Sequence, residues 1–158
     1  MQSGRVWVLL TANISHASPL HLLHNALQLL HFGPVLQTTL GCERLLTLIG
    51  CASLASSVAS VVWHGYSRRP GGASEGSLGA SGVVLSLVAA NAALFPRTLV
   101  RMYGVELTAT GLLVLYSAID VLGHRAQDGR VDASAHIGGA LCGWLMASRW
   151  AQSVRFWL

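Results

Sequence analysis

The sequence of 158 residues contains no lysine, and only 10% of its residues are charged. Soluble domains carry about 25% charged residues, so this chain lacks the polar groups that would cover a surface in water. Its hydrophobic fraction is 53%, and its mean hydropathy is +0.54. These shortages favour a membrane protein over a soluble domain.

The basic residues are all arginines, and they are not clustered. They stand singly or in one pair between apolar runs, as Arg44, Arg97 and Arg125 do. Polytopic membrane proteins place charge in this way, at the ends of their spans. A nucleic-acid partner is therefore not expected, although the formal net charge is +4.

Cysteine is also scarce, and the three residues Cys42, Cys51 and Cys142 form no C-x-x-C pair. An odd number at such spacings predicts no disulfide framework, and we interpret these residues as small apolar side chains inside helices. The apolar run within residues 1–11 is too short for a signal peptide, so no cleavable signal is expected.

What the chain does have is a series of apolar stretches near the length of about 20 residues that a spanning helix needs. Turn-forming glycine and proline separate them, with a tight turn expected at residues 41–44. The sequence therefore predicts an all-α membrane protein, folded as one domain over residues 1–158. The five predicted spans cover residues 20–40, 45–64, 77–96, 105–123 and 133–148.

Ser81 lies near the start of the third span, between Gly79 and Gly82. Glycine allows a second backbone or a substrate to come close. The N-terminus of a helix offers free N–H groups that can stabilise an oxyanion. Taken alone, the motif is more typical of a small-residue packing face of a membrane helix.

His136 precedes Gly139 and Gly143, which form a G-x-x-x-G face suited to close helix contact. If the partner helix is the one that carries Gly79 and Gly82, His136 and Ser81 come together. A neutral imidazole can then accept the serine proton. A lone histidine is otherwise most often a satisfied core residue.

His21 and Asn25 are spaced i and i+4 in the first span and so share one helical face. Two donors that face one point could complete an oxyanion hole, or they could bond across neighbouring helices. His16 and His24 add further imidazoles, but the spacing matches no zinc signature and no acid lies near it. A metal site is not expected.

Asp120 is the only aspartate inside a predicted span. It could orient His136 as the acid of a soluble triad does. It could equally lie at the end of its helix beside His124 or Arg125. We favour the second position and do not predict a triad.

Together these motifs resemble those of the rhomboid family. Residues 16–25 look like its second-helix motif, residues 79–82 like its nucleophile motif, and residues 135–143 like its last catalytic helix. Their order and separations also match, and the resemblance covers residues 4–147. It implies a rhomboid-like helical bundle and an intramembrane serine endopeptidase that needs no cofactor. The substrates implied are single-pass transmembrane proteins in the lipid bilayer.

The resemblance also implies the roles of individual residues. Ser81 and His136 would form a catalytic dyad without an aspartate. His21, Asn25 and the backbone N–H of Ser81 would form the oxyanion hole, while Gly79 would shape the loop that leads to it. The helix carrying Ser81 would begin inside the membrane, so its irregular lead-in would line a water-filled cavity.

Residues 77–82 and 118–120 look most similar to the mitochondrial, presenilin-associated rhomboid-like branch, which implies the mitochondrial inner membrane. The family's first helix has no counterpart here, so the domain is expected to be N-terminally truncated. Two alternatives stay open. One is a non-catalytic relative that binds membrane clients, and the other is a histidine-rich protein that binds metal or haem.

Overall fold

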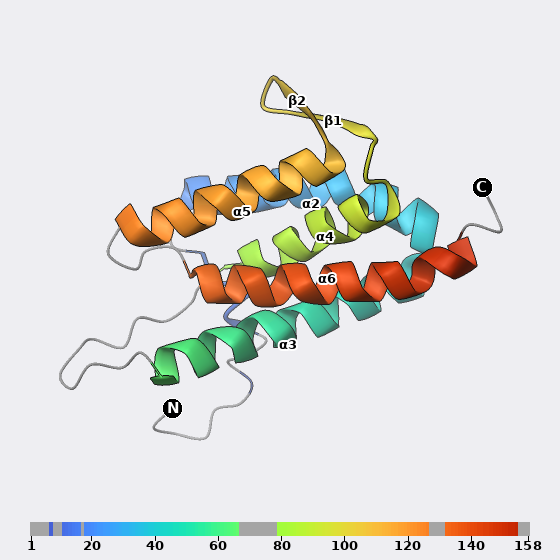
Figure 1. Cartoon of the computed structure of the whole chain (residues 1–158). Coiled ribbons are helices and arrows are strands. Elements are labelled where there is room, and N and C mark those ends of the chain that lie inside the picture. The colour runs from blue at the N-terminus through green and yellow to red at the C-terminus, as the bar shows by residue number, and fades with distance from the viewer. Residues whose placement is uncertain (1–6, 8–10, 17, 67–78, 127–131, 155–158) are drawn as a thin grey trace.

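The computed structural model describes residues 7, 11–16, 18–66, 79–126 and 132–154. These residues form five α-helices and one two-stranded hairpin (Figure 1). The elements in chain order are α2 (Pro19–Leu40), α3 (Cys42–Tyr66), α4 (Ser81–Leu94), β1 (Leu99–Met102), β2 (Val105–Thr108), α5 (Ala109–Ala126) and α6 (Ala133–Val154). The expected helical bundle is confirmed, with the hairpin as an addition.

Local sequence explains where the helices begin and end. In α2, the Ser18 side chain accepts a hydrogen bond from the backbone N–H of His21 at 3.2 Å, and Pro19 occupies the first turn, both of which favour a helix start. Gly41 ends α2 with a φ of 84°, and α3 begins at the next residue. The tight turn predicted over residues 41–44 is therefore wrong beyond Gly41, because Glu43 already lies in the first turn of α3.

The fourth predicted span is wrong at its start. Val105–Thr108 is a strand that pairs with Leu99–Met102, and the helix begins only at Ala109. Tyr103 and Gly104 connect the strands with φ values of 52° and 79°, the left-handed pair that a two-residue hairpin turn requires. Glu106 consequently lies in the hairpin, paired with Arg101 at 2.9 Å, and not in a span.

Helix α4 lies at the centre of the bundle, with α2 and α5 on one side and α3 and α6 on the other (Figure 1). Every residue from Gly82 to Ala92 is buried. Its 14 residues reach about 21 Å at 1.5 Å per residue, which is less than the bilayer core of about 30 Å. The first residue of α4, Ser81, contacts His136 of α6, and the next residue, Gly82, packs on Ser56 of α3. Ser81 therefore lies inside the ends of these longer helices (Figure 1).

Small residues bring α6 against α3 and α4. A Cβ on Gly139 would collide with the carbonyl oxygen of Gly82, and one on Gly143 would collide with that of Ser86. A Cβ on Gly138 would lie 2.6 Å from Cβ of Ala59 and 2.8 Å from the carbonyl oxygen of Ala55, both in α3. Backbones approach in this way only where side chains are small, so the predicted G-x-x-x-G contact with the serine-bearing helix is confirmed.

The start of α6 is tied to α3 through Asp132. Its Oδ1 accepts hydrogen bonds from the backbone N–H of Ala135 at 3.1 Å and from Ser134 Oγ at 2.5 Å. Its Oδ2 accepts a hydrogen bond from Ser60 of α3 and lies 3.4 Å from His64 Nε2. Asp132 thus caps α6 and also fixes that end of the helix four residues before His136.

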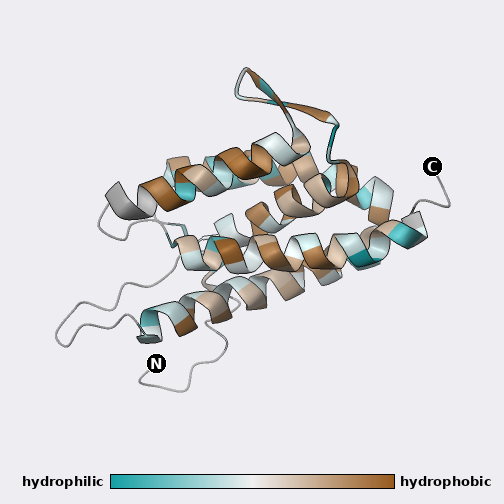
Figure 2. Ribbon diagram, in the orientation of Figure 1, coloured by the Kyte–Doolittle hydropathy of each residue, from teal (hydrophilic) through white to brown (hydrophobic). Residues whose placement is uncertain are grey.

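The outer surface of the bundle is apolar. Leu20, Leu30 and Val114 expose 75%, 71% and 61% of their area, and hydrophobic residues run along the helices while hydrophilic ones gather near the ends of α3 and α6 (Figure 2). A bilayer can solvate such a surface, whereas monomeric soluble proteins rarely expose apolar patches this extended.

By length and composition, one described helix, Cys42–Tyr66, can cross a membrane by itself, with a hydropathy of 2.0. Ser81–Leu94 and Ala109–Leu122 are shorter apolar helices. Five such spans were predicted. The difference in α2 has a physical cause, since it carries polar residues such as His21, Asn25 and Gln28 that lower its hydropathy.

Candidate active site

Ser81 is the first residue of α4 and follows a strained lead-in. Gly79 has a φ of 119°, which side chains rarely adopt. A Cβ at Gly79 would lie 2.6 Å from Cε1 of His21. The backbone N–H of Gly79 donates to the carbonyl of Ala12 at 2.9 Å. Both conformation and space therefore require glycine here, and the loop holds the serine at the helix N-terminus.

His136 comes from the first turn of α6 and meets Ser81 across the small-residue seam. Its Nε2 lies 2.6 Å from Ser81 Oγ, and only 14% of its side chain is exposed. If Nε2 accepts the serine proton, the ring must carry its own proton on Nδ1. The structure brings together the two residues that sequence motifs had paired, in the geometry of a nucleophile and its base.

Asp120 of α5 lies on the other side of the imidazole, which corrects our sequence interpretation. Its Oδ2 is 2.8 Å from His136 Nδ1, and its side chain is 18% exposed. The carboxylate is out of line with the ring N–H, so the contact is not a well-aligned hydrogen bond. It is a close electrostatic contact that becomes an ion pair when the imidazole is protonated. The sequence interpretation favoured the end of the helix, beside His124 or Arg125. Helix α5 instead continues to Ala126 and turns Asp120 toward His136, while the side chains of His124 and Arg125 lie outside the described residues.

His21 and Asn25 approach the serine loop from α2. The His21 ring packs against Gly79 and meets the ring of His16 edge to face at 5.4 Å. Asn25 is 3% exposed, and among the described residues neither atom of its amide has a hydrogen-bond partner. An unpaired buried amide costs about 1–3 kcal/mol, so its presence here suits a group that bonds to a bound substrate.

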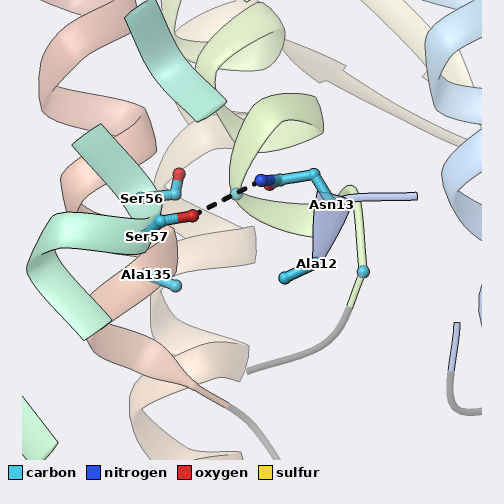
Figure 3. Close-up of a pocket in the computed structure, with 7 residues that line it drawn as sticks. Ala12, Asn13, Ser56, Ser57 and Ala135 are labelled. Carbon is cyan, nitrogen blue, oxygen red and sulfur yellow. Dashed lines mark hydrogen bonds between the residues drawn. The ribbon is translucent and has the colours of Figure 1, made fainter. Parts of the chain in front are cut away.

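A small cavity lies beside Ser81 and His136 on the side of α3. Its volume is about 20 Å³, which is room for about one water molecule. At its edge, the amide of Asn13 donates to Ser57 Oγ at 3.4 Å (Figure 3). The same amide donates to Ser53 Oγ at 2.8 Å. The lining residues are Ala12, Asn13, Ser56, Ser57, Gly79, Gly82 and Ala135.

Sequence reasoning missed this cavity. One signal was available, since Ser53, Ser56, Ser57 and Ser60 follow the i, i+3, i+4, i+7 spacing of a single helical face. Ser56 Oγ is buried beside Gly82 without a hydrogen-bond partner among the described residues. Ser53 and Ser57 accept from Asn13, and Ser60 donates to Asp132. These three serines therefore have a polar role besides close helix packing.

The remaining histidines of α2 point elsewhere. His24 hydrogen-bonds through Nδ1 with Tyr103 of the hairpin at 3.0 Å and stacks on its ring at 5.6 Å. His31 packs edge to face on Phe32 at 4.8 Å. Within the described part of the chain, no three His, Cys, Asp or Glu residues are grouped as metal ligands.

Comparison with known proteins gives this geometry a context. Residues 3–152 match the family model of the Rhomboid domain. The chain is 30% identical over 145 residues to the rhomboid protease GluP of Bacillus subtilis (strain 168), covering 92% of this chain and 26% of that protein. It is also 30% identical over 135 residues to the presenilin-associated rhomboid-like protein A, mitochondrial, of Danio rerio, covering 84% of this chain and 34% of the relative.

Proposed function

Because the chain belongs to the rhomboid family of integral membrane proteins, we propose that it is an intramembrane serine endopeptidase with Ser81 as nucleophile and His136 as general base. The observation that carries the proposal is the 2.6 Å contact between Ser81 Oγ and His136 Nε2. A serine hydroxyl becomes a useful nucleophile when such a base accepts its proton.

In the first half of the reaction, Ser81 Oγ attacks the carbonyl carbon of the scissile peptide bond while its proton passes to His136 Nε2. The carbonyl oxygen becomes an oxyanion. The backbone N–H of Ser81, at the start of α4, donates to it together with His21 and the amide of Asn25. Donors held in place before the reaction stabilise this charge without reorganising.

In the second half, the intermediate collapses and the C–N bond breaks. His136 returns its proton to the leaving amine, and the other product stays attached to Ser81 as an ester. Water then attacks the ester carbonyl and gives a proton to Nε2. Collapse releases the acid and restores the Ser81 hydroxyl with that proton.

The substrates proposed are single-pass transmembrane proteins, since Ser81 lies within the thickness of the bundle and the outer helical faces suit lipid. The compartment proposed is the mitochondrial inner membrane, supported by the relative from Danio rerio whose name includes mitochondrial. The relative from Bacillus subtilis carries the name of a protease. It supports the proposed activity but not the proposed compartment, which rests on the relative from Danio rerio. The chain spans about a quarter to a third of the length of these relatives.

Labelling with a fluorophosphonate probe in liposomes tests the proposal. The wild type should label, Ser81→Ala should not, and His136→Ala should label far more slowly. Ser117→Ala on α5 and the exposed His31→Ala are matched controls that should label as the wild type does. Absence of labelling in folded wild type would contradict the protease and favour a relative that binds membrane clients. Labelling retained in Ser81→Ala would mean that another serine reacts.

A further inference from the structure

Asp120 is a charged group in an apolar helix with a specific partner. Its neighbours on α5, Ile119, Val121 and Leu122, are exposed apolar residues. An ionised carboxylate inside a membrane span is costly, and where one occurs it usually serves a function. The described contact of this carboxylate is the 2.8 Å approach to His136 Nδ1.

We propose that Asp120 is a positioning residue for the proposed reaction, which this inference therefore rests on. It holds His136 in the tautomer with its proton on Nδ1, so that Nε2 stays free to accept from Ser81. It also offsets the positive charge that His136 gains when the proton arrives. A negative charge beside Nδ1 favours both states, and more strongly in a poorly solvated site than in water.

The position of the Asp120 carboxylate indicates whether its charge or a hydrogen bond to Nδ1 contributes more. Because the carboxylate is out of line with the N–H of the ring, charge contributes more here than a directional hydrogen bond. In soluble serine proteases, where the acid is aligned, replacing it with an amide lowers turnover about 10⁴-fold. We expect a smaller loss of about 100-fold here, because only the charge component of that arrangement is in place.

The test measures the rate of phosphonate labelling at saturating probe and the probe concentration for half-maximal rate, with the full chain in liposomes. Asp120→Asn keeps the shape of the side chain and removes its charge. It should lower the saturating rate about 100-fold without changing the half-maximal concentration or the melting temperature. Asp120→Glu keeps the charge and should recover part of the rate. Glu106→Gln, which removes a carboxylate from the exposed hairpin pair, is the matched control and should label normally.

Each other result overturns the inference. Asp120→Asn that labels at the wild-type rate would leave the protease standing and remove Asp120 from it. Rescue by Asn but not by Glu would assign Asp120 a packing role. A change in half-maximal concentration alone would assign it to the probe pocket. Wild type that fails to label removes the proposed function itself, and this inference with it, so the two failures are distinguishable.

Discussion

A serine, a histidine and an aspartate meet at two places in this bundle, and the same residue types are connected differently at each. At the first, His136 stands between Ser81 and Asp120, with one ring nitrogen toward each. At the second, Asp132 stands in the middle and accepts from Ser60, while His64 lies beside the same carboxylate oxygen.

The central residue decides what each cluster can do. In the first, the imidazole can take a proton from the serine and pass it on. In the second, the serine donates to a carboxylate that also caps α6. A carboxylate is a much weaker base than an imidazole, so it is less suited to take the serine proton. Residue composition alone does not distinguish a candidate active site from a structural clamp, and the order of contacts does.

The largest expected effect is on the labelling rate when the histidine of the first cluster is removed, compared with removal of the histidine of the second. His136→Ala should lower the rate of fluorophosphonate labelling by about 10²–10⁴-fold, the usual contribution of a general base. His64→Ala should leave that rate within about twofold, since His64 contacts only the capping carboxylate in the described structure. Labelling kinetics on both variants check this. Equal losses would mean that the two clusters act together.

The next effect comes from separating the helices that form the first cluster. In Gly139→Ala the added methyl group collides with the backbone of Gly82, so we expect a loss of about 1–3 kcal/mol in stability and slower labelling. Gly50→Ala on α3 is the control, because nothing lies within 4 Å of its added Cβ. Thermal unfolding in detergent measures both. Equal melting temperatures would contradict the close contact between α4 and α6.

A smaller effect is expected at the clamp. Asp132→Ala removes the cap of α6 and should lower stability by about 1 kcal/mol. Asp132→Asn keeps a capping oxygen and should lose less. Melting temperatures, compared with labelling rates at a temperature where all variants are folded, check this. A loss of labelling in folded Asp132→Asn as large as that of His136→Ala would place the second cluster in the chemistry.

The smallest effect is expected for Ser60→Ala. It removes one hydrogen bond to Asp132, which retains its bonds from Ala135 and Ser134, so stability should fall by about 0.5 kcal/mol, the low end for one hydrogen bond. Labelling should not change, in contrast with its complete loss in Ser81→Ala. Any fall in the labelling of folded Ser60→Ala would contradict the assignment of this serine to the clamp.

Much of the fold was predictable because membrane helices leave a strong signal. Apolar length located five helices, and the glycines at 139 and 143 identified which helix face meets the serine. These signals depend on residue size and hydropathy, which are known for each residue from the sequence alone. The catalytic roles of Ser81 and His136, like the oxyanion roles of His21, Asn25 and Gly79, remain predictions.

The contact of Asp120 with His136 was not predicted, for a physical reason. Its position along α5 was correct, but the direction of its side chain depends on how α5 is rotated against α6. Amphipathicity indicates that rotation for a helix in water. It does not do so for a helix that exposes apolar residues to lipid over much of its surface. The hairpin was missed because Val105 and Leu107 were counted as apolar helix residues. The Tyr103–Gly104 turn was a weak signal without a glycine or asparagine at its first position.

The seam between α4 and α6 also has a consequence for sequence variation. Where the helices touch backbone to backbone, at Gly82, Gly139 and Gly143, a saturation library should recover almost no substitution. Lipid-facing sites such as Leu30 and Val114 should accept most apolar residues. Side-chain volume would thus limit substitution at the seam, whereas hydrophobicity alone would limit it at the lipid-facing sites. A relative could drift far along its outer faces while the three glycines at its centre stay the same.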